Sequence, residues 1–135
     1  MNDFTDSRYI IQLREKLNQI SENAYEKIAN ITELPPSEGL KILRVLLENA
    51  CLAQNVGVIT LAREKIKEIQ KEWLINYLSE GVEKSINLED EWEYRRLLEL
   101  LIEILPELFN YYINIGLCSD NIEVAEVARD FLSPN

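Results

Sequence analysis

Apolar residues recur at intervals of three and four along most of this chain of 135 residues. This spacing places them on one side of an α-helix, whereas a half-buried strand would alternate at every second residue. The chain has only four glycines and four prolines, so it has few of the residues that an all-β chain uses at its turns. The pattern therefore predicts an all-α fold, and the length suits a single domain over residues 1–135. The first apolar stripe consists of Ile10, Leu13, Leu17, Ile20, Ala24, Ile28 and Ile31.

Prolines and capping residues divide this pattern into a bundle of about six predicted helices. Asp3 and Asp6 form an acidic capping box at the first start, and Pro35 and Pro36 end that helix. Pro106 disfavours helical geometry at the residue before it, which predicts a new helix from Pro106, with one kinked helix as the alternative. The predicted helices span residues of about 4–31, 37–54, 57–80, 88–104, 106–117 and 121–132, with 81–87 as a connection.

The widest apolar stripes predict which residues form the core, and the helix over 37–54 has the broadest apolar arc. We expect that helix to be central. Trp73 and Tyr77, four residues apart on the stripe of the next helix, are also assigned to the core. The residues expected to be buried together are Leu43, Leu47, Ala50, Ile66, Ile69, Leu97 and Leu101.

Two segments of the sequence are similar to each other. Residues 55–64 lie over residues 121–130 with an offset of 66, and asparagine, valine, alanine and arginine coincide. One interpretation is a pair of related helical hairpins; the other is that two amphipathic helices with an asparagine near the cap look alike. The second segment resembles a HEAT-type repeat helix, which implies HEAT-like helical hairpins. The resemblance rests on Asp120, Val124, Val127, Ala128 and Leu132.

Negative charge is concentrated in the last third of the chain. The net charge is −10, and residues 88–135 contain eleven acidic and three basic residues. Glu99, Glu103 and Glu107 follow one another at intervals of four, where like charges repel along a helix, and a basic partner would offset that repulsion. The alternative is a solvated helix face that keeps the protein soluble. Nucleic acid is not expected as a ligand, because phosphate contacts need lysine and arginine.

Aromatic residues accompany the acidic ones, and protein interfaces favour tryptophan and tyrosine as anchors. Trp92 lies within an acidic stretch and Tyr111 follows Glu107, so each is a candidate anchor. The alternative for Trp92 is that it covers the end of the bundle and is buried. The predicted partner-binding residues are Glu89, Asp90, Glu91, Trp92, Glu93, Glu99, Glu103, Glu107 and Tyr111.

Few residues for catalysis or for metal and cofactor binding are present. There is no histidine and no glycine-rich phosphate loop, so we expect no catalytic residues, no metal and no cofactor. Cys51 and Cys118 are expected to be reduced, small buried side chains rather than a disulfide. The acidic N-terminus lacks a secretory signal and no apolar run is long enough to span a bilayer, which predicts a cytoplasmic protein without a membrane partner.

A further resemblance is carried by residues 91–100, 106–108, 116–120 and 128–131. These segments resemble small acidic helical proteins that are encoded beside bacterial polymorphic toxins as immunity factors. The resemblance implies tight binding to one cognate toxin domain without catalysis. Together with the charge asymmetry it predicts an immunity-type inhibitor that neutralises a basic toxin or enzyme through an acidic face. The alternatives are an architectural or oligomerising helical domain, which allows a homo-oligomer, and a small carboxylate-dependent enzyme.

Overall fold

Seven α-helices and two short 3-10 helices lie between residues 7 and 133, the part of the chain that the computed structural model describes. No strand occurs in that part, so the all-α prediction is confirmed. None of these helices is long and apolar enough to cross a membrane. In chain order they are α1 (Ser7–Ile20), η1 (Ile28–Glu33), α2 (Pro36–Cys51), α3 (Val56–Lys67), α4 (Lys71–Ser85), α5 (Glu91–Ile104), η2 (Pro106–Leu108), α6 (Phe109–Leu117) and α7 (Ile122–Leu132).

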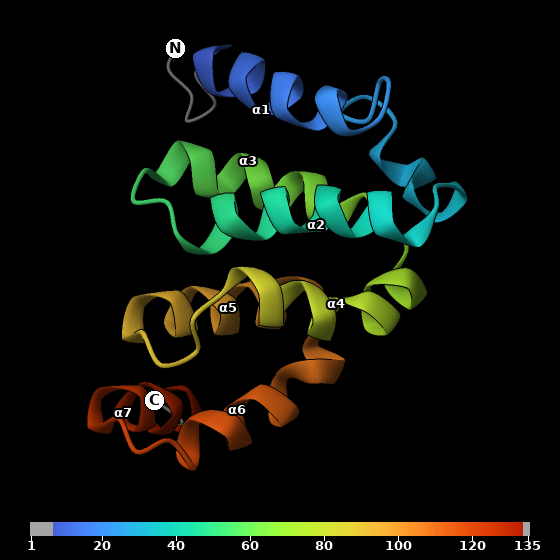
Figure 1. Cartoon of the computed structure of the whole chain (residues 1–135). Coiled ribbons are helices and arrows are strands. Elements are labelled where there is room, and N and C mark those ends of the chain that lie inside the picture. The colour runs from blue at the N-terminus through green and yellow to red at the C-terminus, as the bar shows by residue number, and fades with distance from the viewer. Residues whose placement is uncertain (1–6, 134–135) are drawn as a thin grey trace.

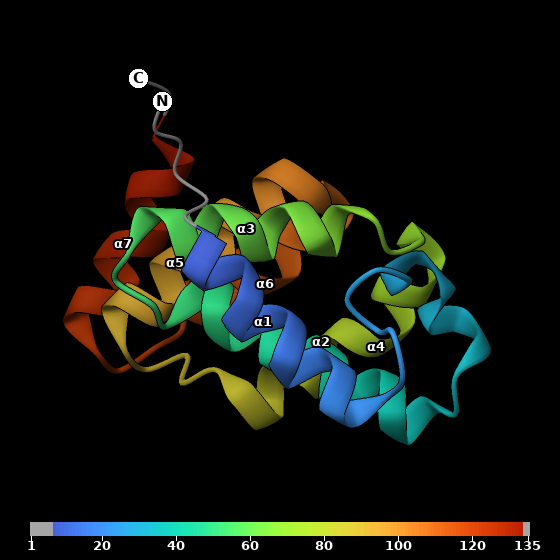
Figure 2. The same cartoon turned by 90° about the horizontal axis from the view of Figure 1, so that it is seen from above.

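The helices are stacked in layers (Figure 1). Helix α1 forms the first layer, α2 and α3 the second, α4 and α5 the third, and α6 and α7 the fourth. Seen from above, α1 crosses the layer of α2 and α3, which it contacts (Figure 2). The arrangement in pairs agrees with the helical hairpins expected from the sequence, while the HEAT-type resemblance of those pairs stays a prediction.

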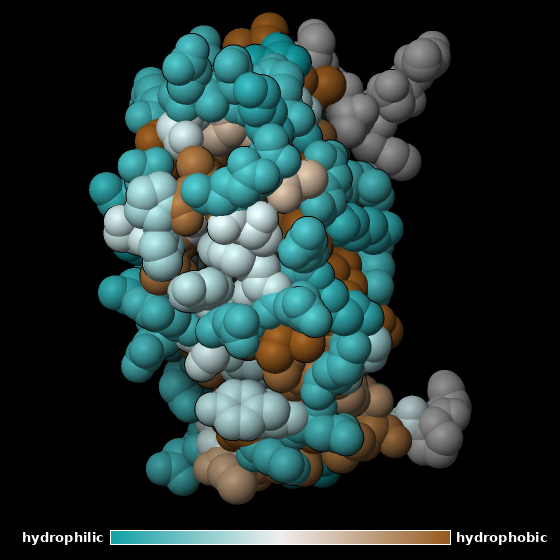
Figure 3. Space-filling model, turned by 90° about the vertical axis from the view of Figure 1, so that its right-hand side faces the viewer, coloured by the Kyte–Doolittle hydropathy of each residue, from teal (hydrophilic) through white to brown (hydrophobic). Residues whose placement is uncertain are grey.

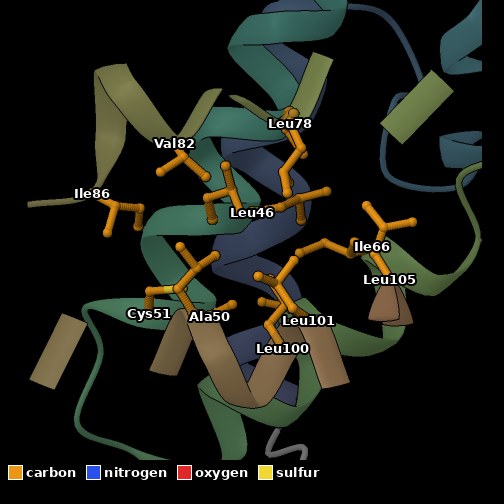
Figure 4. Packing of buried hydrophobic residues seen from close by; sticks show 14 of the residues in the cluster. Leu46, Ala50, Cys51, Ile66, Leu78, Val82, Ile86, Leu100, Leu101 and Leu105 are labelled. Carbon is orange, nitrogen blue, oxygen red and sulfur yellow. The ribbon is translucent and has the colours of Figure 1, made fainter. Parts of the chain in front are cut away.

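The core runs through the middle of the stack, and α2 lies at its centre. Helix α2 contacts α1, α3, α4 and α5, as its broad apolar arc predicts. Figure 4 shows side chains of α2, α3, α4 and α5 meeting in one cluster. All seven predicted core residues are buried in this cluster, Trp73 is buried and Tyr77 packs against it, so the core prediction is confirmed.

The single helix predicted over residues 4–31 is wrong, because α1 ends at Ile20. Asn23 has a φ of 60°, in the left-handed region, and the Tyr25 backbone N–H donates to Asn18 Oδ1 at 2.9 Å. Such local bonds compete with helical ones. The Tyr25 ring also holds this turn in place, because Lys65 Nζ of α3 lies 4.0 Å from its centroid. The predicted start and capping box, at residues 3–6, lie outside the described residues.

The helix predicted over residues 57–80 is also divided. Helix α3 ends at Lys67 and α4 begins at Lys71, with Gln70 in an extended conformation between them. The backbone N–H groups of Glu68 and Ile69 donate three residues back, to Lys65 and Ile66, which closes a tight turn. No glycine or proline marks this break. The predicted connection over 81–87 is mostly helical as well, since α4 continues to Ser85.

Proline at position 106 separates two helices. Leu105 has φ −143° and ψ 63°, outside helical geometry, so the alternative of one kinked helix is wrong. Pro106 begins a 3-10 helix, and the α-helix that follows starts at Phe109 rather than at the proline. The break between α3 and α4 changes the expected six helices into seven α-helices over the described residues, and the other two differences add the 3-10 helices η1 and η2.

Candidate functional site: an acidic edge around Trp92

The connections within the three helix pairs lie along one edge of the stack, at the left in Figure 1. We call this edge, formed by residues 52–55, 86–90 and 118–121, the loop edge. Asn55, Asp90 and Asn121 cap α3, α5 and α7 there, and their side chains accept hydrogen bonds from the first backbone N–H groups of each helix. The second helix of each pair therefore begins at the loop edge.

Trp92 stands out from the loop edge. Its side chain is 60% exposed, so the alternative in which it covers the end of the bundle and is buried does not hold. The Arg95 guanidinium lies 5.6 Å from its ring centroid, within the range of a cation–π contact. Val56 and Ile122, the first residues of α3 and α7, are 59% and 71% exposed. The loop edge therefore exposes large apolar side chains at the starts of three helices.

A cleft of about 410 Å³ lies beside Trp92. The end of α2 and the loop after it form one wall, and the first turns of α5 form the other. Of the predicted partner-binding residues, Asp90, Trp92 and Glu93 line this cleft. The remaining lining residues are Cys51, Leu52, Ala53, Gln54 and Arg96.

The acidic residues at the start of α5 are held in place by hydrogen bonds. Asp90 Oδ1 accepts from the backbone N–H groups of Trp92 and Glu93 at 2.9 and 3.0 Å. Glu93 Oε1 accepts from a backbone N–H of the preceding loop at 2.7 Å. Glu89 Oε1 accepts from the Ser119 hydroxyl at 2.7 Å, which joins this region to the loop before α7. These bonds fix the carboxylates, and none of them neutralises their charge.

Glu91 faces another carboxylate. Desolvation and, next, the nearby Glu123 of α7 raise the pKa of Glu91 above its ordinary value, and Arg95 opposes this more weakly. None of the ion pairs found between residues 7 and 133 involves Glu89, Asp90, Glu91 or Glu93. The start of α5 therefore carries negative charge that no ion pair of the described residues offsets.

The other predicted glutamates, on α5 and η2, have partners inside the molecule. Arg63 contacts Glu99 at 2.9 Å and Glu103 at 3.7 Å, and Lys67 contacts Glu103 at 2.7 Å. One turn further on, Lys71 Nζ lies 3.1 Å from Glu107 Oε2. Arg63, Lys67 and Lys71 follow one another at intervals of four, as the three glutamates do. The row of cations therefore lies alongside the row of glutamates. The repulsion seen in the sequence is thus offset within the chain, and we call this arrangement the ion-pair ladder.

Tyr111 lies apart from both groups. It is 58% exposed on α6, where its ring meets that of Tyr112 edge-on with the centroids 4.9 Å apart, and it does not line the cleft. The nine predicted residues therefore fall into three places rather than on one face.

The side of the stack opposite the loop edge shows largely hydrophilic residues with apolar ones between them (Figure 3).

The two cysteines differ in their surroundings. Both are free thiols; Cys51 is buried as predicted, whereas Cys118 is exposed, because it lies in the turn after α6. Burial raises the pKa of the Cys51 thiol to about 12, so the thiol in the cleft is neutral. No group of three or more acidic or cysteine side chains in the described part of the chain is placed to hold a metal ion.

Comparison of this chain with protein-family models, with curated proteins and with solved structures finds no match.

Several residues of this region were not predicted from the sequence. Leu52, Gln54 and Arg96 complete the cleft, and Glu123 joins the acidic group from α7. One feature of the sequence points to this region: residues 55–64 and 121–130, which begin with the caps of α3 and α7, are similar to each other. That similarity indicates that the two helices start at one edge, and Trp92 lies in the segment between them.

Proposed function

We propose that this chain is a non-catalytic protein-binding module of the immunity type, which neutralises a basic toxin or enzyme. The surface that serves this function is the part of the loop edge around Trp92. The observation that carries the proposal is a tryptophan that is 60% exposed beside a cleft, among four acidic residues without an ion pair in residues 7–133. Exposed apolar anchors inside a charged rim are typical of protein interfaces.

The apolar part of this surface supports binding rather than solubility. Trp92 and Leu52, which is 43% exposed, both line the cleft. An indole that stays exposed to water contributes no hydrophobic stabilisation, whereas covering it with a partner removes a large apolar area from solvent. The surface thus has an anchor whose burial would slow dissociation.

The charged part supports a basic partner. Desolvation is the first cause of the raised pKa of Glu91, and the second is its repulsion by Glu123 across α5 and α7. A cation brought by a partner would relieve it. Exposed charge of one sign also speeds the encounter with a partner of opposite charge.

The ion-pair ladder reduces the number of acidic residues that we assign to the binding surface. Since Glu99, Glu103 and Glu107 contact cations of α3 and α4, they contribute less free charge than their position in the sequence suggested. Substituting them would disturb the packing of α3 against α5 as well as any binding. The binding surface is therefore assigned to Glu89, Asp90, Glu91, Trp92 and Glu93.

The test uses the basic proteins encoded by the genes beside this one, each purified and titrated against the full chain. We expect one of them to bind at low salt and to lose activity in the complex. Raising the salt should slow association, because exposed charges are screened over about 8 Å at physiological ionic strength. Trp92→Ala should weaken binding by about tenfold or more, as for an interface hot spot.

Ile75→Ala is the matched control, because Ile75 is an apolar residue of α4 that is 41% exposed and does not line the cleft. It should bind as the parent protein does. If no basic neighbour binds, or if Trp92→Ala and Ile75→Ala bind equally well, the proposal fails and an architectural role replaces it.

A further inference from the structure

We infer that the cleft beside Trp92 receives one arginine or lysine side chain of the protein partner. This inference rests on the proposed function and names the group by which the partner is recognised. A cleft of about 410 Å³ is at the small end of protein ligand pockets. It suits one long side chain better than a helix or a loop.

Two carboxylates in the cleft wall have oxygens available for a cation. Asp90 accepts both of its backbone hydrogen bonds through Oδ1, and Glu93 accepts its bond through Oε1. The hydrogen bonds found within residues 7–133 leave Asp90 Oδ2 and Glu93 Oε2 without a donor. Since an ionised carboxylate accepts through both oxygens, each can still bind an ammonium or a guanidinium.

The cation that already lines the cleft is engaged elsewhere. Arg96 Nη1 lies 3.1 Å from Oε1 of Glu99, a glutamate of the ion-pair ladder. Arg95, which contacts the Trp92 ring, is not part of the cleft lining. The two carboxylates therefore outnumber the cation in the cleft, which favours a positive ligand over a neutral or negative one.

The remaining lining suits the aliphatic part of such a side chain. Trp92 and Leu52 are apolar, and the Cys51 thiol, which also lines the cleft, is neutral. Lysine and arginine bury their methylene groups against apolar surface while the charged end reaches polar groups. A purely apolar ligand would instead cover the two carboxylates without giving them a hydrogen bond, which costs free energy.

The test is a nuclear magnetic resonance titration of the isotope-labelled full chain at low salt. The probe is the blocked tripeptide Gly-Arg-Gly, with a matched peptide in which neutral citrulline replaces arginine. We expect the arginine peptide to shift the Trp92 indole and Gln54 backbone signals in a saturable manner. The citrulline peptide should bind about tenfold more weakly, since it has no charge for the carboxylates.

Asp90→Asn combined with Glu93→Gln tests the two carboxylates. Each amide keeps the oxygen that accepts the backbone hydrogen bonds, and asparagine is as good a helix cap as aspartate. We expect this double variant to lose about tenfold in affinity for the arginine peptide. The control is Glu83→Gln with Glu126→Gln, two exposed residues of α4 and α7 outside the cleft, which changes the net charge equally. The same spectra show whether each variant is folded.

Equal binding of the arginine and citrulline peptides would overturn the inference, and so would an equal loss in the control variant. Failure here differs from failure of the proposed function. If a basic protein binds and needs Trp92, yet the arginine peptide leaves the cleft signals unchanged, the module binds its partner without a cation in the cleft.

Discussion

The hydroxyl of Tyr94 lies directly against Gly116, where a Cβ atom on that residue would be placed. Tyr94 is fully buried in α5, and its hydroxyl donates a hydrogen bond of 2.8 Å to the Tyr112 carbonyl oxygen of α6. Burial raises the pKa of the Tyr94 hydroxyl to about 12, so it stays protonated and able to donate. This contact fixes how the last helix pair sits on α5.

Gly116→Ala is therefore expected to destabilise the protein strongly. The added methyl group overlaps the Tyr94 ring, which has no free space to move into, and overpacking of this kind costs about 1–3 kcal/mol or more. Urea unfolding followed by circular dichroism measures the loss. A fully stable Gly116→Ala variant would contradict this packing.

Charge reversal in the ion-pair ladder should also lower stability. Glu99→Lys replaces an attraction to Arg63 and Arg96 by repulsion, and we expect a loss of about 1 kcal/mol in the free energy of unfolding. Glu83→Lys, which changes the net charge equally at an exposed position, is the control and should cost less. High salt should reduce the difference between the two variants. Equal losses would mean that the ladder contributes no stability.

The ladder also predicts how stability depends on pH. A bond to its own backbone N–H and, next, Lys71 hold the pKa of Glu107 below 4.5, so its contribution is complete above that pH and is lost as the pH falls through the lowered value. Glu103 raises the pKa of Lys67 above 10.5, so that contribution is complete below pH 10.5 and is lost at higher pH. Glu107→Gln should flatten the acidic limb of the melting temperature against pH, and Lys67→Met the alkaline limb. Unchanged limbs would contradict the ladder.

The pKa of Glu91 tests directly whether the carboxylates of Glu91 and Glu123 act on each other. Carboxyl titration by nuclear magnetic resonance should give a value above 4.5, because desolvation and Glu123 disfavour the charged form. Glu123→Gln removes the nearest like charge and should bring the pKa down. Glu126→Gln, on the same helix, should leave it unchanged, and an equal effect of both variants would show that only net charge matters.

The core was predictable because burial depends on side-chain spacing, which the sequence displays. The two missed breaks were not, because the same stripe continues across them. Ile66 and Ile69 are buried on either side of the end of α3, and Ala24 and Ile28 are buried after α1 has ended. A tight turn that keeps these residues facing the core leaves the apolar spacing intact. The left-handed conformation of Asn23 leaves no mark in hydrophobic periodicity.

The candidate site was predictable only in part. The exposure of Trp92 depends on where α5 begins, and the predicted start at about residue 88 is three residues too early, because the helix starts at Glu91 with Asp90 as its cap. Arg96 is a local partner of Glu99, three residues away on α5, but Arg63 and Lys67 lie on α3 in the neighbouring layer, and no local pattern pairs them with Glu99 and Glu103. Long-range neighbours of this kind depend on how the helix pairs are stacked. The sequence shows where the acidic residues are concentrated. It does not show which of them pair with cations of the same chain and which face solvent.

The layered order of the helices has a consequence for how the molecule opens. Helices α6 and α7 make their main contacts with each other and with α5, while α2 contacts four helices. Slow hydrogen exchange should therefore be found in α2, and the last layer should exchange faster than α2, as a separate cooperative unit. Glu89 accepts hydrogen bonds from Ser119 and Asn121, so the acidic segment is tied to the loop of this last layer. A partner that covers that segment should therefore slow hydrogen exchange throughout α6 and α7, including the turns that it does not touch.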